Sequence, residues 1–195
     1  MRVLLLTALL FLPQAESGQF EVSLNGQRIG TEQFSILRSG DGFLATGRMR
    51  FQVDGQSVEA ESRMELDAAL HPVSYEYRSG SRRISVDVGP ETAEVEITVD
   101  GETTSVDVRF PSDGMIVDDN LFHHYLLLLH RLGAAGGEIS VLVPQQLTMG
   151  TLRVEPAGDR TYEVVSENLR LRASTDEEGR LVRLVAPDSS VVVER

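Results

Sequence analysis

Three of the four histidines of the chain lie in one short segment, DDNLFHHYLLLLHRLG, which runs from Asp118 to Gly133. Histidine is suited to general acid–base catalysis near neutral pH and to zinc binding, so this segment is the first candidate for chemistry. Two histidines chelate one metal ion from a helix when they are four residues apart, as in H-E-x-x-H. Here His123 and His130 are two helical turns apart, roughly 10 Å along the axis, and position 127 is leucine. The spacing therefore predicts no metal site.

The same segment has the pattern of a single amphipathic helix, which we expect over residues 119–132. Residues 118–120 are Asp, Asp and Asn, which are suited to cap the start of a helix, and Gly133 is suited to end it. At about 100° per residue, one face is apolar and holds Leu121, Phe122, Tyr125, Leu126, Leu128, Leu129 and Leu132. The opposite face holds Asn120, His123, His124, His130 and Arg131, together with Leu127. We interpret the histidines as the polar back of the helix, solvated or partly buried against loops at a sheet edge.

A lone catalytic histidine in this helix would need a nucleophile and an orienting acid from elsewhere in the chain. The sequence contains no G-x-S-x-G, phosphate-binding, dinucleotide-binding or calcium-loop motif. It has no cysteine, and all 18 basic residues are arginine, which excludes thiolate nucleophiles, cysteine-held zinc and lysine Schiff bases. We predict a non-enzymatic protein with no catalytic residues, no metal and no cofactor. A hydrolase is kept as a third alternative, because carboxylates are plentiful.

The first residues, MRVLLLTALLFLPQAESGQF, have the three parts of a secretory signal peptide. A basic residue is followed by an apolar run from Val3 to Leu12, and small residues come next at Ala15 and Ser17. The run is shorter than the roughly 20 apolar residues that span a membrane. We predict a signal peptide over residues 1–17, cleaved after Ser17 or alternatively after Ala15, and a single β-rich domain over residues 18–195.

The composition of the chain limits the cellular compartments and the kinds of partner that we expect. An exported protein without cysteine is more typical of the bacterial periplasm, or of secretion into the medium, than of the small secreted domains that disulfides stabilise. The 30 acidic residues exceed the 18 basic ones, giving a net charge of −12, which argues against nucleic acid because phosphate contacts dominate such binding. We expect a lipid-like ligand or another envelope protein as the partner, and no membrane span. The oligomeric state is left open.

Most of the chain consists of short runs in which apolar and polar residues alternate. The run around Asp54-Gly55 is the clearest, because Asp-Gly favours a two-residue hairpin turn. This turn places Phe51 opposite Val58 on an apolar face. It also places Arg50 opposite Glu59 on a charged face. The agreement of turn chemistry, alternation and charge pairing predicts a β-hairpin with this register.

Similar signals recur along the chain. Asp100-Gly101 predicts a second hairpin, and Asn25-Gly26 a third, in which Val22 faces Ile29 and a bulge follows near Gly30. Many short alternating strands separated by turn signals predict a mainly antiparallel β fold. We expect a meander that forms a curved sheet or half-barrel, with the amphipathic helix packed on it.

One apolar helix, DDNLFHHYLLLLHRL, after about eight strands, and a turn-rich closing hairpin, DEEGRLVRL, give the chain a recognisable layout. It resembles that of bacterial periplasmic half-barrel proteins, which include the lipoprotein-carrier fold and related uncharacterised exported families. In those proteins a curved sheet wraps helical segments and can enclose acyl chains. The resemblance implies a concave sheet face that meets the helix, and it assigns no role to any single residue.

Methionines and phenylalanines on the inner face of such a sheet would suit an adaptable apolar site. We predict a binder or carrier of a hydrophobic or amphipathic ligand, whose site is lined by Met49, Phe51, Met64, Phe122 and Leu129. The alternative is a structural or protein-interaction module of the cell envelope, in which the same residues fill a core. An open apolar space of a few hundred cubic ångströms would distinguish the carrier from the module.

Overall fold

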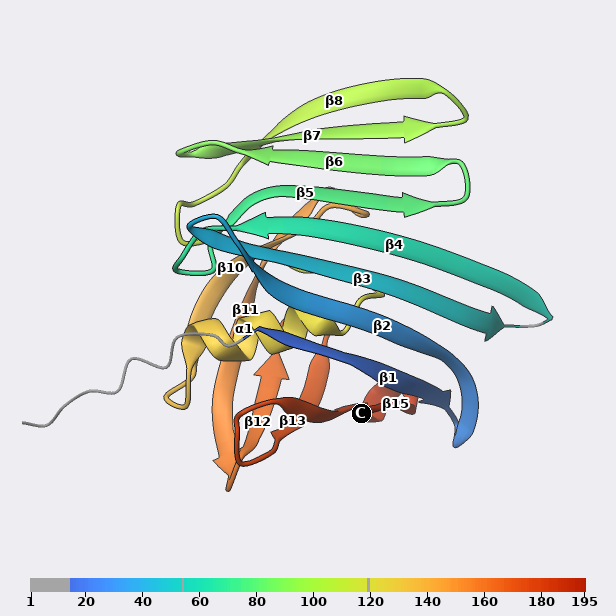
Figure 1. Ribbon diagram of the computed structural model, residues 1–195, viewed down its shortest axis with the longest axis vertical. Helices are drawn as coiled ribbons and strands as arrows, with labels where there is room; N and C mark the ends of the chain where they lie inside the picture. The colour runs from blue at the N-terminus through green and yellow to red at the C-terminus, as the bar shows by residue number, and fades with distance from the viewer. Residues whose placement is uncertain (1–14, 54, 119) are drawn as a thin grey trace, which may run out of the picture.

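The computed structural model describes residues 15–53, 55–118 and 120–195. Within these residues fifteen strands form one open, strongly curved sheet (Figure 1). The first eight strands follow one another as an antiparallel meander. They are β1 (Glu16–Leu24), β2 (Gln27–Ser39), β3 (Gly42–Val53), β4 (Gln56–Leu66), β5 (Pro72–Ser79), β6 (Arg82–Val88), β7 (Thr92–Val99) and β8 (Glu102–Arg109).

The second half of the chain extends the same sheet and contributes the helix of the fold. Its elements are β9 (Met115–Ile116), α1 (His123–Leu132), β10 (Gly137–Val143), β11 (Thr148–Gly158), β12 (Thr161–Val165), β13 (Arg170–Thr175), β14 (Leu181–Ala186), the 3₁₀ turn η1 (Pro187–Ser189) and β15 (Val191–Glu194). The short β9 pairs in parallel with β10, while the hairpin-connected strands pair antiparallel. The predicted mainly antiparallel curved sheet with a packed helix is therefore confirmed.

The two meanders are joined in the middle of the sheet, where β1 pairs with β15. Val22 lies opposite Val193 in this pairing, and both side chains are buried. The outer edges of the sheet are β8 on one side and the short β9 on the other. The chain therefore runs outward from the centre to β8, continues at the opposite edge with β9, and returns to the centre from β10 to β15, with α1 connecting β9 to β10.

The predicted hairpin register is confirmed on β3 and β4. Phe51 pairs with Val58, and Arg50 pairs with Glu59, so one face of the hairpin is apolar and the other carries opposite charges. Arg50 Nε lies 3.0 Å from Glu59 Oε1 in an exposed ion pair. Asp54 of the turn lies outside the described residues.

The third hairpin differs from its prediction by one residue. Val22 pairs with Gly30 instead of Ile29, because the register shifts between Val22 and Ser23 and leaves Ile29 as the extra residue. The bulge was expected next to Gly30 and falls immediately before it. Close approach explains the glycine, since a Cβ on Gly30 would lie 2.2 Å from the carbonyl oxygen of Arg50.

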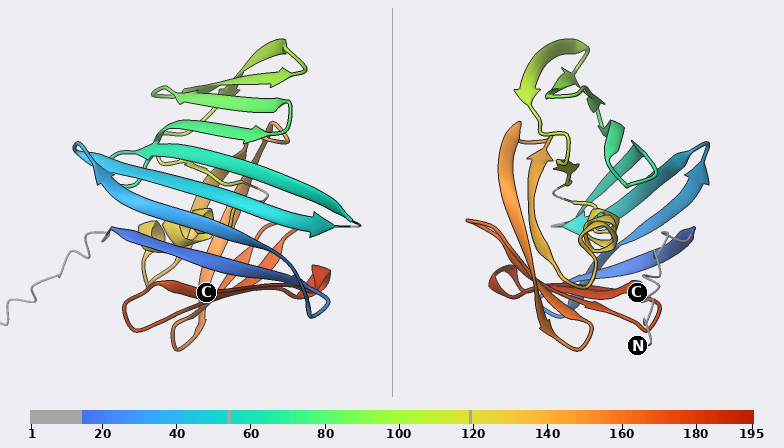
Figure 2. Two further views of the ribbon diagram at one scale, coloured as in Figure 1. Left: turned by 45° about the vertical axis from the view of Figure 1, so that its right-hand side comes forward. Right: turned by 90° about the vertical axis from the view of Figure 1, so that its left-hand side faces the viewer.

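Helix α1 lies in the trough of the curved sheet, between β1–β4 on one side and β10–β13 on the other (Figure 2). It begins at His123, four residues later than the predicted start at 119. Asp118 does not cap it, because its Oδ1 accepts a hydrogen bond from the backbone of Asn120 before the helix starts. Asp119 lies outside the described residues. Gly133 ends the helix as predicted, with its N–H donating to the carbonyl of Leu129.

The inner faces of both meanders and most of α1 form one hydrophobic core. The largest fully buried side chains come from all parts of the trough: Phe20, Ile36, Met49, Met64, Tyr75, Ile84, Phe110, Met115, Ile116, Leu121, Leu126 and Leu127. No helix in the described part of the chain is long and apolar enough to cross a membrane. The predicted signal peptide falls mainly on residues 1–14, outside the described residues, whereas Glu16 and Ser17 belong to β1.

Candidate functional site

The start of α1 is held by a carboxylate from a distant strand. Glu32 lies on β2, where alternation with Phe34 and Ile36 turns its side chain into the trough, and it is completely buried. Its Oε2 accepts a hydrogen bond from the backbone N–H of Phe122 at 2.7 Å, and Oε1 accepts one from the N–H of His123 at 3.4 Å. Glu32 thus satisfies amides that have no partner within the helix. It therefore acts as the N-cap of the helix, although it lies ninety residues earlier in the chain.

The same carboxylate contacts the first histidine of the helix. Glu32 Oε1 lies 2.5 Å from His123 Nδ1, and neither side chain is exposed. Burial raises the pKa of Glu32 to about 8, more than the two backbone hydrogen bonds lower it. Burial lowers the pKa of His123 to about 3. The pair therefore holds one shared proton and no net charge across the neutral range, which is the state that a water-free site favours.

Small and aromatic side chains of the sheet make room for this histidine. The ring of His123 stacks on Phe34, with ring centroids 6.2 Å apart and an interplanar angle of 6°. Gly47 of β3 faces the ring, and a Cβ at this position would lie 2.5 Å from His123 Cε1. The glycine therefore lets the helix approach the sheet closely enough for the contact between Glu32 and His123.

A second polar group fixes the chain just before the helix. The backbone N–H of Asp118 donates to His124 Nδ1 at 3.0 Å, which assigns the proton of that neutral ring to Nε2. The carboxylate of Asp118 accepts hydrogen bonds from the hydroxyl of Tyr75 and from the side-chain amide of Gln145. Burial raises the pKa of the Tyr75 hydroxyl, and the neighbouring Asp118 raises it further. Tyr75 therefore stays a hydrogen-bond donor.

The interpretation of the histidines as a solvated or partly buried helix back is wrong for two of the three. His123 and His124 have no exposed surface, because this side of α1 lies against the first meander. Glu32 and Phe34 of β2 contact the ring of His123, and Tyr75 of β5 contacts the ring of His124. Burial lowers the pKa of both imidazoles, so both are neutral. This arrangement attaches the helix to the sheet.

His130 keeps the predicted character, at the exposed end of the helix. It lies 3.5 Å from Glu16, through its Nε2 and the Oε2 of the carboxylate. Across residues 15–53, 55–118 and 120–195, no group of three or more His, Asp or Glu side chains is arranged to hold a metal ion. The prediction of no metal site at the histidines remains open to experiment.

A signal for the buried group was present in the sequence. The inward positions of three neighbouring strands should all be apolar, yet they include Glu32, Gly47 and Ser62, and the side chain of Ser62 is buried with its Oγ unpartnered. A charged residue and two small ones on the inner face together indicate that a polar group from elsewhere docks there. The polar and small residues that break the apolar alternation of these strands would have identified this docking position.

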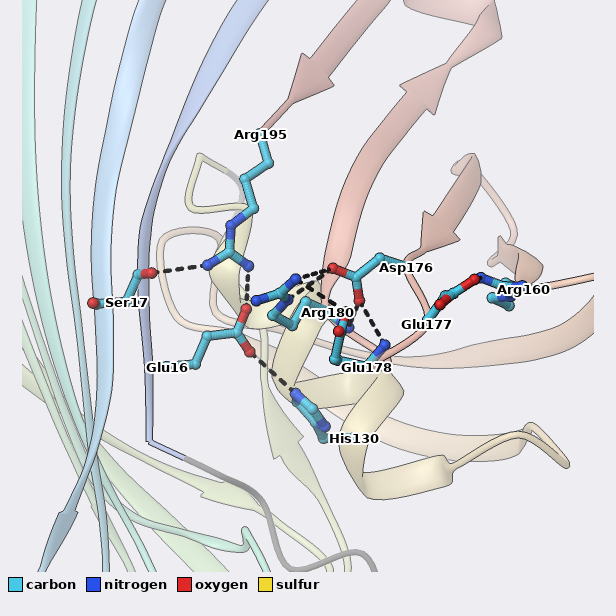
Figure 3. Close-up of polar contacts among 9 residues, drawn as sticks. All are labelled: Glu16, Ser17, His130, Arg160, Asp176, Glu177, Glu178, Arg180 and Arg195. Atoms are coloured by element: carbon cyan, nitrogen blue, oxygen red, sulfur yellow. Dashed lines mark hydrogen bonds and ion pairs between the residues drawn. The ribbon is translucent and has the colours of Figure 1, made fainter.

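A third polar group joins the start of β1 to the end of β15 and to α1 (Figure 3). The carboxylate of Glu16 contacts the guanidinium of Arg195 and Nε2 of His130. Nearby, Arg180 binds Asp176 at 2.7 Å and Glu178 at 3.0 Å. Glu16 therefore links the last turn of α1 to the start of β1 and the end of β15.

The five residues predicted to line a ligand site lie together in one hydrophobic cluster. Met49, Met64 and Leu129 are buried, while Phe51 and Phe122 are half-buried and pack against the same core. Met49, Phe51 and Met64 come from the sheet, whereas Phe122 and Leu129 come from the start and the middle of α1. Whether a ligand replaces part of this contact stays a prediction.

Two shallow surface hollows lie away from these five residues. One, of about 450 Å³, is lined by Ile97, Val99, Asp100, Glu102 and Thr104 at the end of the β7–β8 hairpin. The other, of about 440 Å³, lies over β2–β4 and is lined by Gln33, Phe34, Ser35, Thr46, Gly47, Arg48, Glu61 and Ser62. The first combines apolar side chains with carboxylates and lies on the hairpin at the β8 edge of the sheet, which we call the open end of the trough.

Comparison with known proteins supports the fold and goes no further. No protein-family model matches the chain, and no curated protein matches it. A crystal structure of a DUF1089 family protein from Pseudomonas aeruginosa is similar to it, with a TM-score of 0.54 and 15% sequence identity. The match covers 92% of this chain and 94% of that one. The chain therefore shares a mainly β fold, over nearly its whole length, with a protein to which it has little sequence similarity.

Proposed function

We propose that the protein is exported and binds or carries a hydrophobic or amphipathic ligand in the open end of its trough. The observation that carries this proposal is apolar surface on the inner face of the sheet that α1 leaves uncovered. Val106 and Val99 lie on the inner face of the β7–β8 hairpin and are 38% and 43% exposed. An exposed apolar surface beside a hollow of several hundred cubic ångströms is typical of a ligand site.

The rim of this hollow favours an amphipathic ligand over a purely apolar one. Ile97 and Val99 provide apolar contact, while Asp100 and Glu102 are carboxylates on the same rim. With a net charge of −12 on the chain, an anionic head group would be repelled. A neutral or cationic head group next to an apolar chain fits these side chains best. The layout similarity to lipoprotein-carrier half-barrels is consistent with such a ligand.

A structural or protein-interaction module of the envelope is the second candidate, and a different observation favours it. Met49, Met64 and Leu126 are almost completely buried, so the trough beneath α1 is already filled by the protein itself. The edge strand β8 is exposed along nearly its whole length and offers unpaired backbone groups to another strand. In that case the inner face would be a core and β8 the contact surface.

A binding experiment with a fluorescent fatty-acid probe and a matching fatty-amine probe separates the two candidates. The carrier predicts saturable binding, with the amine bound more tightly than the acid. Val106→Asp should weaken binding at least tenfold with little loss of stability, because the side chain is partly exposed. Leu37→Ala is the matched control, since Leu37 is an exposed apolar residue of β2 on the outer face.

The behaviour of Leu129 provides the second measurement. If the helix moves aside for ligand, Leu129→Ala should weaken probe binding and cost less than the full core penalty. If the trough is only a core, the same change should cost about 2–5 kcal/mol of unfolding free energy. A protein that binds neither probe and loses core-like stability on this change would be the structural module.

A further inference from the structure

The first residues of β1 are part of the folded protein. Glu16 is buried, and its carboxylate contacts the guanidinium of Arg195 and the imidazole of His130 (Figure 3). Burial alone would raise the pKa of Glu16, but hydrogen bonds from His130 and Arg195 lower it below its ordinary value. Glu16 is therefore an ionised partner of Arg195 that also contacts His130.

Arg195 is held by three consecutive residues at the start of β1. Its Nη1 contacts Glu16, and its Nη2 donates to the carbonyl of Ser17 at 2.8 Å. Gly18 leaves space for the guanidinium, since a Cβ there would lie 2.8 Å from Nη2. The cation also lies over the ring of Phe34, 5.3 Å from its centroid. These contacts make the start of β1 the binding site of the Arg195 side chain.

The backbone of the same residues belongs to the sheet. Glu16 pairs with Ile36 and Ser17 pairs with Ser35 in the β1–β2 ladder. A chain that began at Gly18 would lose these two pairs, the Glu16 carboxylate and the Ser17 carbonyl together. It would leave the guanidinium of Arg195, whose side chain is 21% exposed, without its anionic partner, which is costly for a partly buried cation.

We propose that signal peptidase cuts this chain between Ala15 and Glu16, so that Glu16 is the first residue of the exported protein. The proposal rests on the export stated above, and it chooses Ala15 over Ser17 as the residue before the cut. Ala15 is small, as the enzyme requires at that position, and it is exposed. The cut then leaves every contact of Glu16, Ser17 and Gly18 in the mature protein.

The variant Ser17→Leu tests this choice directly. Leucine is too large for the position before a signal-peptidase cut, so it blocks cleavage after Ser17 and leaves cleavage after Ala15 open. The side chain of Ser17 is exposed and its contact with Arg195 uses the backbone carbonyl, so the fold should accept the change. Ala15→Leu is the control for a blocked cut. The full untagged chain is expressed in a bacterium and its intact mass and first residues are determined in each fraction.

We expect the wild type and Ser17→Leu to be recovered from the periplasm with Glu16 as the first residue, and Ala15→Leu to accumulate as precursor. A mature chain that begins at Gly18 or elsewhere, or a Ser17→Leu chain that is not processed, would overturn the proposal. A wild-type precursor that stays in the cytoplasm would overturn the export on which it rests. A cytoplasmic precursor would thus contradict the export itself, whereas an exported chain with another first residue would contradict only the proposed cut.

A measurement of thermal stability tests the role of Glu16 itself. Glu16→Gln removes the charge that faces Arg195 and His130, and should lower Tm by at least 2–4 °C, the shift that about 1 kcal/mol produces in a domain of this size. Glu21→Gln is the matched control on the same strand, because its ion pair with Arg28 is exposed. Equal Tm values for the two variants would show that Glu16 is dispensable and would count against the proposed cut.

Discussion

Glu32 Oε1 lies 2.5 Å from Nδ1 of His123, and both side chains are completely shielded from solvent. The contact joins the second strand of the sheet to the first turn of the helix. Because both groups are titratable and buried, the link between helix and sheet depends on a single proton.

Stability should fall above pH 6.5 because of Glu32. Burial raises its pKa from 4.5 to about 8, so between these values the folded chain keeps a proton that the unfolded chain has lost. Burial lowers the pKa of His123 from 6.5 to about 3, which cancels this effect between pH 4.5 and 6.5. The uncompensated loss from 6.5 to 8 is about 2 kcal/mol, measurable by urea unfolding at a series of pH values.

Glu32→Gln should remove this alkaline loss, since the amide does not titrate. The loss of stability below pH 6.5 should become larger, because burial lowers the pKa of His123 and of His124 and Glu32 no longer offsets the effect of His123. Glu21→Gln, an exposed change on β1, should leave the profile of the wild type unaltered. An alkaline loss of equal size in Glu32→Gln and wild type would contradict the assignment.

Gly47→Ala should destabilise the protein by about 1–3 kcal/mol through overpacking. The added Cβ would lie 2.5 Å from Cε1 and 2.8 Å from Nδ1 of His123, and the ring is held between Glu32 and Phe34. Gly150→Ala is the control, because the nearest atom to its Cβ is 3.9 Å away and a surface change of this kind stays within about 0.5 kcal/mol. Similar losses in the two variants would refute the close approach at Gly47.

The hairpin register predicts unequal effects from two neighbouring residues. Arg50→Ala should change the unfolding free energy very little, because its ion pair with Glu59 is exposed. Phe51→Ala should cost about 2–3 kcal/mol, somewhat less than a completely buried phenylalanine, since Phe51 is half-buried against the core. Chemical denaturation of both variants checks this, and equal losses would show that the register is wrong.

Purified protein should contain no stoichiometric zinc bound through His123, His124 or His130. The Nδ1 atoms of His123 and His124 are already engaged by Glu32 and by the backbone of Asp118. Elemental analysis provides the test. One zinc per chain in the wild type, lost on mutation of any of the three histidines, would overturn this expectation.

Local sequence patterns predicted the strands and hairpins, because each of these depends on residues that are close together in the chain. The Asp54-Gly55 pairing followed from turn chemistry and alternation within fifteen residues, and Gly133 marked the end of the helix. The helix start was misplaced because its capping group, Glu32, is ninety residues away. The environment of His123 could not follow from helical periodicity alone, since that periodicity assumes a helix with one side in water. Burial on both sides requires the second meander, which is a property of the whole chain.

The pairing of β1 with β15 has a consequence for the order of assembly during synthesis. Every other antiparallel neighbour of β1–β8 can form from chain that has already emerged, but Val22 must wait for Val193, which is made after all of these strands. Until then the first meander has an open central edge as well as the β8 edge, and its apolar inner face is uncovered until α1 arrives. Such long-range pairing is slow and exposes surfaces that aggregate. A chaperone that keeps the growing chain unfolded should therefore increase the yield of native protein more than one that acts after release.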